Sequence, residues 1–207
     1  AIPGWSSELP PQVDATGRDM IHGGSAIFRA FSPVRRSEVQ NDPVSIAWTM
    51  TGTPVSRPNE RLNVPGSPVE VDVLALDGYQ GWAYREYQKF IGEERSRVTE
   101  AVINTQAWQD AVDTGDFGPN SIIAEALRDQ IRQATRAGKL RFLKWAEGRT
   151  EFTPHVNGEP VSDPVQMEPI DLETIRGLSR LIKQQGPPEH VMQTINHLQM
   201  LRYNQLR

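Results

Sequence analysis

The sequence predicts a mainly helical α+β fold, in which an extended, proline-rich N-terminal third with a few β-strands precedes a body of about five helices with a small inserted β-hairpin. The distribution of proline is the main evidence. The 207 residues contain 16 prolines, and nine of these fall within the first 68 residues. Because proline lacks an amide donor and clashes inside a helix, long helices are expected only where it is absent. Those stretches are 69–118, 120–153, 170–186 and 189–207.

The composition narrows the class of protein further. Hydrophobic residues make up 37% of the chain and the net charge is −4. No apolar run approaches the ~20 residues that a membrane-spanning helix needs. Cysteine is absent, which excludes disulfides, thiolate zinc sites and cysteine nucleophiles. The prolines divide the chain into an extended arm and β-rich segment at residues 1–78 and a helical domain at residues 79–207, with one continuous domain as the alternative.

The first residues of the chain are expected to form an arm. Residues 1–24 contain Pro-Pro and Gly-Gly pairs and scattered polar groups, with Ile2, Trp5 and Leu9 as the expected anchors. Such a segment rarely orders by itself, because it has little apolar surface to bury. We therefore expect the arm to order against another surface.

Two strands are expected after the arm. Apolar residues alternate with smaller or polar ones over residues 44–50 and again over residues 69–73, as in strands with one buried face. The segment Thr53–Pro68 between them contains four prolines. Its length and composition predict a long loop rather than a tight hairpin.

Three helices are expected in the first part of the helical body. The first begins near Gly81 and is kinked or ended by Gly92, and the second stops at Gly115. The third has Pro119 in its first turn and closes at Gly138. These boundaries follow from the preference of glycine for positions just past a helix end.

A hairpin and two further helices complete the prediction. Asn157-Gly158 lies between two prolines and accepts the positive φ angles of a type I′ turn, which predicts a small edge hairpin. Asp171 is expected to cap a helix that ends at Gly186. A last helix over residues 189–207 is expected to pair with it in antiparallel fashion.

One short motif suggests catalysis. Asp113-Thr114-Gly115 follows apolar residues and is similar to the active-site loop of aspartic proteases, in which two such aspartates share a proton. That loop requires a preceding β-hairpin, whereas residues 93–112 have a helical pattern. A helix end at Gly115 is therefore the favoured interpretation. A hydrolase that uses Asp113 or the Ser25 region stays as an alternative.

No cofactor and no metal site is expected. The chain has neither a P-loop nor a G-x-G-x-x-G motif, which gives nucleotide binding no support. His190 and His197 would lie about 10 Å apart along a helix axis, too far to share one metal. Asp110, Asp113 and Asp116 lack the ligand order of a calcium-binding loop.

A basic stripe is the strongest charge pattern. Residues 128–149 contain seven basic residues against two acidic ones: Arg128, Arg132, Arg136, Lys139, Arg141, Lys144 and Arg149. Such a stripe suits nucleic-acid phosphates or an acidic partner. A solvated helix face, with Glu125 paired to Arg128 and Asp129 paired to Arg132, is the favoured interpretation.

These observations together favour a structural, self-assembling protein, most concretely a viral capsid or shell subunit found in the virion or the cytoplasm. The expected partners are copies of the same chain, with nucleic acid at the stripe as a further candidate and no membrane span. Trp5, Trp82 and Tyr84 are the candidate assembly contacts, on the expectation that they are exposed. The alternatives are a hydrolytic enzyme with Asp113 and a nucleic-acid-binding adaptor or regulator.

Overall fold

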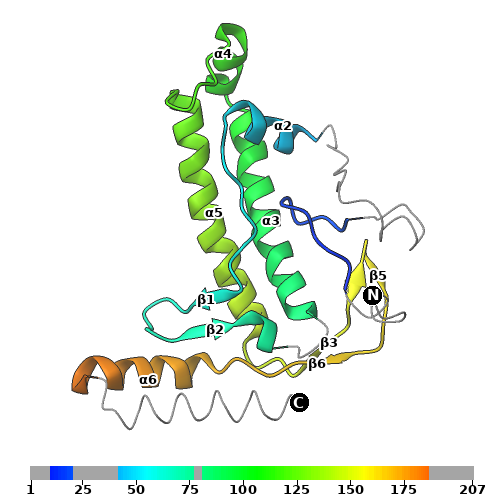
Figure 1. The fold of residues 1–207 in the computed structure, drawn as a ribbon, viewed down its shortest axis with the longest axis vertical. Coiled ribbons are helices and arrows are strands. Elements are labelled where there is room, and N and C mark those ends of the chain that lie inside the picture. The colour runs from blue at the N-terminus through cyan, green and yellow to red at the C-terminus, as the bar shows by residue number, and fades with distance from the viewer. Residues whose placement is uncertain (1–9, 21–41, 77–80, 187–207) are drawn as a thin grey trace, which may run out of the picture.

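The computed structural model describes residues 10–20, 42–76 and 81–186, and its centre is a long antiparallel pair of helices (Figure 1). Helix α3 spans Trp82–Ile103 and helix α5 spans Ile122–Ala146, and they lie side by side along the molecule. The short helix α4, Gln106–Thr114, joins them at one end. The fold is mainly helical α+β, as the proline distribution predicts.

The two ends of the helical pair carry different small elements. Near α4, the short helix α2, Pro43–Met50, shares buried clusters with α4 and α5. Toward the other end, strand β1, Arg61–Asn63, pairs with the antiparallel strand β2, Glu70–Asp72. The 3₁₀ helix η2, Val73–Ala75, continues from β2 and packs against α3.

The chain after α5 forms two small antiparallel ribbons and one helix. Strand β3, Glu151–Phe152, pairs with β6, Val165–Gln166, and strand β4, His155–Val156, pairs with β5, Glu159–Pro160. Helix α6, Leu172–Gln185, then runs across the base of the helical pair (Figure 1).

The largest core lies at this base. It contains a chain of aromatic contacts in which the rings of Tyr87 and Phe142 lie 5.2 Å apart and those of Trp145 and Phe152 lie 5.4 Å apart. Leu62 of β1 is fully buried in the same cluster. This core therefore joins the ribbon β1–β2, the helical pair and the β3–β6 ribbon.

Neither Gly92 nor Gly138 ends a helix, so the helix ends predicted at these two glycines are wrong. Each glycine lies inside a continuous helix at a point where another backbone crosses. A Cβ added to Gly138 would lie 2.6 Å from the Cα of Ile91 on α3. A Cβ added to Gly92 would lie 2.2 Å from the backbone nitrogen of Gly17, where residues 10–20 cross α3. The missing side chains allow close packing, which outweighs the low helix propensity of glycine.

The predicted strand over residues 44–50 is also wrong, because these residues form α2. Asp42 has an extended backbone and Pro43 occupies the first helical turn, a position that suits its fixed φ angle. Val44, Ala47 and Trp48 then share one buried face at helical spacing. The apolar alternation does not correspond to burial, since the other large apolar residues of α2 are exposed.

Several turn and cap signals are confirmed. Gly115 ends α4 in the left-handed conformation with φ 71°, as predicted. The helical pattern expected over residues 93–112 is interrupted between α3 and α4, where Thr105 caps α4. Asp171 accepts hydrogen bonds from the backbone of the first turn of α6. Asn157 and Gly158 have φ angles of 51° and 86°, as the hairpin turn requires.

Other boundaries differ from the prediction. The predicted loop Thr53–Pro68 contains β1, a strand too short to show an alternating pattern. The strand expected over residues 69–73 ends at Asp72 because η2 follows. Pro119 precedes α5 rather than lying in its first turn, since Ser121 is the cap. The expected helix over residues 189–207 lies outside the described residues.

Candidate functional site

One end of the helical pair is acidic along an unbroken stretch of sequence. Residues 98–127, which run from α3 through α4 into α5, contain five Asp and Glu residues and no Lys or Arg. The acidic residues on α4, on the following turn and on the first turn of α5 are exposed. We call this surface the acidic tip, and its members are Asp110, Val112, Asp113, Asp116, Ile122 and Glu125.

Two β-branched apolar side chains are exposed within the acidic tip. Val112 is 47% exposed and Ile122 is 86% exposed. Their chain neighbours Ala111 and Ile123 belong to one buried cluster, so the exposed side chains lie on two helices in direct contact. Single exposed apolar residues are ordinary, but a pair among carboxylates offers a partner both contact area and charge.

Local interactions fix the shape of the acidic tip. The Ser121 hydroxyl accepts a hydrogen bond from the backbone N–H of Ala124 at 3.2 Å and so caps α5. The ring of Phe117, in the turn after α4, lies 5.1 Å from the ring of Trp108. The turn between α4 and α5 is thus packed onto α4.

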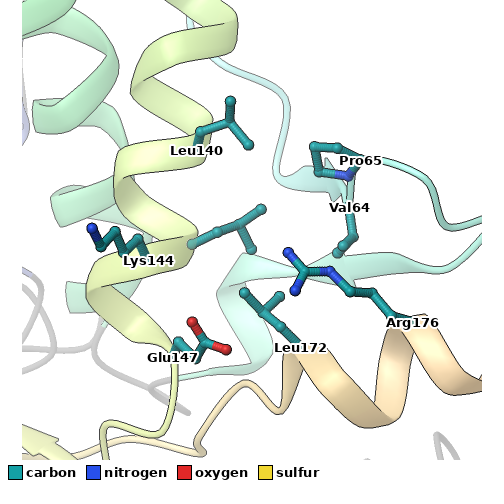
Figure 2. A pocket seen from close by; sticks show the side chains of 8 residues that line it. Val64, Pro65, Leu140, Lys144, Glu147, Leu172 and Arg176 are labelled. Atoms are coloured by element: carbon teal, nitrogen blue, oxygen red, sulfur yellow. The ribbon is translucent and has the colours of Figure 1, made fainter.

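A groove lies near the opposite end of the helical pair, between α5, α6 and the turn after β1 (Figure 2). Its volume is about 330 Å³, and most of its lining is aliphatic. We call it the basic groove, for the cations on and around it, and it is lined by Val64, Pro65, Leu140, Leu143, Lys144, Glu147, Leu172 and Arg176.

Helix α6 is held in place at the groove by contacts with the β1–β2 turn. The Ser179 hydroxyl donates a hydrogen bond to the carbonyl of Gly66 at 2.8 Å, and Lys183 Nζ donates to the same oxygen at 3.3 Å. Leu172 is buried at the start of α6. Figure 2 shows the Arg176 side chain extending from α6 across the groove toward α5.

The surroundings of the groove are positively charged. Residues 136–147 of α5 and its C-cap contain four cations and one acid, and residues 172–185 of α6 contain three cations and one acid. Leu140 lies among the α5 cations and is 51% exposed. Among the described residues, an apolar surface with a basic border is therefore exposed at this end of the helical pair.

The structure divides the predicted basic stripe into two groups. One group has partners within the chain: Arg128 donates to the carbonyl of Pro119 at 2.5 Å, and Arg132 forms the predicted ion pair with Asp129. The predicted pairing of Arg128 with Glu125 is not present. Arg149 also stays within the chain, where its guanidinium stacks on Trp145.

Arg141 belongs to the same internally bound group. Its guanidinium lies 2.7 Å from Glu94 Oε1 and 3.3 Å from Glu93 Oε2, so it bridges α5 to α3. Burial acts to raise the pKa of Glu94, but hydrogen bonds from Arg97 and Arg141 outweigh it and lower that pKa. Arg141 thus stabilises the helical pair.

The second group has no such role. Within the part of the chain that the structure describes, Arg136, Lys139 and Lys144 form no side-chain hydrogen bond and no ion pair. Lys144 lines the basic groove, and the other two lie on the same half of α5. These three cations are the members of the stripe that are available to a partner.

The Asp-Thr-Gly motif lies at a helix end. Asp113 is an exposed residue in the last turn of α4, and Gly115 is its left-handed C-cap. Within residues 10–20, 42–76 and 81–186, no group of three or more His, Asp or Glu side chains is placed to hold a metal ion. The Ser25 region and His190 and His197 lie outside these residues.

The candidate assembly contacts differ in how far they are buried. Trp82 is only 7% exposed, so its expected exposure is wrong. It packs into the largest core, at the base of the helical pair, and the Arg85 guanidinium lies 5.2 Å from its ring. Tyr84 is half-buried, and its hydroxyl donates to the carbonyl of Pro58 at 2.8 Å. Trp5 lies outside the described residues.

Comparison of the chain with protein-family models, with curated protein sequences and with solved structures found no match. Among the described helices, none is both long enough and apolar enough to cross a membrane. The function must therefore be inferred from the chemistry of the two ends of the helical pair.

Sequence reasoning missed both the basic groove and the apolar part of the acidic tip. The groove is assembled from three segments that lie far apart in the sequence, so no local pattern marks it. Two signals were nevertheless present. Ile123, Leu127 and Ile131 recur at the spacing of one helix face, and Ile122 lies outside this stripe. Leu140 lies between two cations, which marks an apolar residue on an exposed helix face.

Proposed function

We propose that this chain is a structural, self-assembling protein, a subunit of a viral capsid or a similar shell. The observation that carries the proposal is the polarity of the helical pair, which has an acidic tip with exposed apolar residues at one end and a basic groove near the other. Opposite charges steer association and select the partner, while apolar contact contributes affinity. Two copies of this chain therefore carry complementary surfaces.

The helical pair is suited to hold these surfaces at a fixed separation. Helices α3 and α5 are in contact along their length, and Gly138 brings their backbones close together. The Arg141 bridge to Glu93 and Glu94 adds an electrostatic tie between them. A rigid subunit loses little conformational entropy when it assembles, which favours a regular structure.

The part of the arm that the structure describes does not contribute to this proposal. Residues 10–20 bind their own chain, where Val13 is buried and the backbone around Gly17 lies against α3. The proposed contacts of the arm with another copy therefore rest on its residues 1–9 and 21–24, with Trp5 as the candidate contact. The Thr53–Pro68 segment likewise binds its own chain, since it contains β1, which pairs with β2.

Sedimentation velocity over a range of protein and salt concentrations tests the proposal. We expect the average mass to rise with protein concentration and to fall as salt screens the charges at the two ends. A single species of monomer mass at every concentration, including low salt, would contradict self-assembly.

Nucleic-acid binding is a second candidate, favoured by the three cations of the stripe that have no partner within the described residues. Replacing Arg136, Lys139 and Lys144 with Gln would weaken binding and flatten its dependence on salt, because fewer counterions are released. Replacing Arg132 with Gln is the matched control, since its guanidinium is already paired with Asp129. Equal binding by both variants would remove this candidate.

A further inference from the structure

We infer that the copies associate head to tail, with the acidic tip of one copy bound in the basic groove of the next. This inference rests on the proposed self-assembly and specifies the contact that produces it. The tip and the groove lie toward opposite ends of the long axis of the molecule (Figure 1). A contact between them uses a different surface on each copy.

The apolar residues of the two surfaces are complementary. Ile122 projects from the first turn of α5 with 86% of its surface exposed, so the described part of its own chain leaves it almost uncovered. The basic groove offers an aliphatic wall, in which Leu140 is itself 51% exposed. Burial of Ile122 and Val112 against this wall removes apolar surface of both copies from water, which favours association.

The charges determine which surfaces meet. Asp113, Asp116 and Glu125 at the tip would face Lys144 and Arg176 at the groove. Two tips brought together would place carboxylates against carboxylates, and two grooves would place cations against cations. Like charges repel, so both symmetric contacts are disfavoured relative to the tip–groove contact.

A head-to-tail contact has a consequence for the assembly. Because each copy keeps one free tip or groove after binding, further copies add until a ring closes or a filament forms. A stable interface buries roughly 800 Å² per partner. Among the described residues the tip offers only two exposed large apolar side chains, Val112 and Ile122, so we expect a single contact to be weak. Assembly should therefore require high protein concentrations.

Charge reversal at each surface gives a direct test. The tip variant carries Asp113→Lys and Asp116→Lys, and the groove variant carries Lys144→Glu and Arg176→Glu. All four side chains are exposed, so the fold is expected to persist, and circular dichroism checks this. We expect each variant alone to be monomeric in sedimentation velocity at concentrations where the unmodified chain assembles.

Mixing the two variants identifies the direction of the contact. The tip variant retains an intact groove and the groove variant retains an intact tip, and the reversed tip and the reversed groove are also opposite in charge. An equimolar mixture should therefore recover the assembly that neither variant shows alone. Arg132→Gln, which alters neither surface, should assemble as the unmodified chain does. Variants that still assemble alone, or a mixture that stays monomeric while the unmodified chain assembles, would overturn the head-to-tail contact and leave the proposed function in place. A monomeric unmodified chain would remove the proposed function itself.

Discussion

The guanidinium of Arg85 forms an ion pair with the carboxylate of Asp19, and both side chains are almost fully buried, at 2% and 6% exposed. Arg85 also donates hydrogen bonds to the carbonyls of Pro11 and His155, at 3.1 and 2.9 Å. Asp19 in turn accepts a hydrogen bond from the backbone N–H of Asn157. One charge pair thus ties residues 10–20, helix α3 and the β4–β5 hairpin together.

Replacing Arg85 with Met should strongly destabilise the protein. The substitution leaves the Asp19 carboxylate buried without its counter-charge, which typically costs about 3–5 kcal/mol. The midpoint of urea denaturation measures the loss. Arg61→Met is the matched control, because the Arg61–Glu70 pair is exposed and separated by 3.8 Å. Its effect should stay within about 1 kcal/mol; an equal loss in both variants would contradict the role assigned to Arg85.

Two glycine substitutions should have opposite effects on stability. In an unobstructed helix, Gly→Ala stabilises by roughly 0.5–1 kcal/mol. Gly177→Ala in α6 should behave in this way, since an added Cβ would meet nothing within 4 Å. Gly92→Ala should instead destabilise, because its Cβ would overlap the backbone of Gly17. Thermal unfolding of both variants measures the difference, and a stabilised Gly92→Ala protein would show that residues 10–20 do not cross α3 there.

A hydrogen bond between two buried side chains tests the position of α2. The indole Nε1 of Trp48 donates to the hydroxyl of Thr99 at 2.9 Å. Thr99→Val preserves the shape but leaves the indole N–H unsatisfied, at a cost of about 1–3 kcal/mol. Thr49→Val, on the exposed side of α2, should change the free energy of unfolding much less. If residues 44–50 formed a strand remote from α3, the two variants would be alike.

The stability of the helical pair should depend on pH through Glu94. The folded state lowers the pKa of this carboxyl below its ordinary value of 4.5. The contribution of Glu94 to the free energy of unfolding is therefore complete above pH 4.5. It is lost as the pH falls through the lower folded-state pKa. Glu94→Gln should flatten the decline of unfolding free energy in this acidic range. An unchanged slope in denaturation curves measured below pH 4.5 would contradict the ion pairs with Arg97 and Arg141.

The elements that could be predicted from the sequence are those with local chemical signals. The cap at Asp171 and the turn at Asn157-Gly158 depend only on neighbouring backbone groups, and both are present. Gly92 and Gly138 look like helix ends by the same local logic. They are misread because the crossing backbones that require glycine lie far away in the sequence.

The segment 44–50 shows a second limit of local patterns. Its apolar residues recur at even positions, which fits a strand, yet Val44, Ala47 and Trp48 also fit one face of a helix. Tertiary contacts with α3 and α4 decide between these two periods. The candidate site depends on tertiary structure in the same way. Only the folded chain shows which arginines of α5 are bound within the chain and which of its cations have no partner among the described residues.

Cysteine cross-linking tests the tip–groove contact most directly, because the chain contains no cysteine of its own. In a variant with Ile122→Cys and Leu140→Cys, the two thiols lie 18 residues apart on α5, about 27 Å along the axis. That distance is too long for a disulfide within one copy. Under oxidation we predict a ladder of dimers, trimers and longer chains on non-reducing gels, whereas each single-cysteine variant yields at most a dimer. A double variant that gives no species beyond the dimer would contradict head-to-tail assembly.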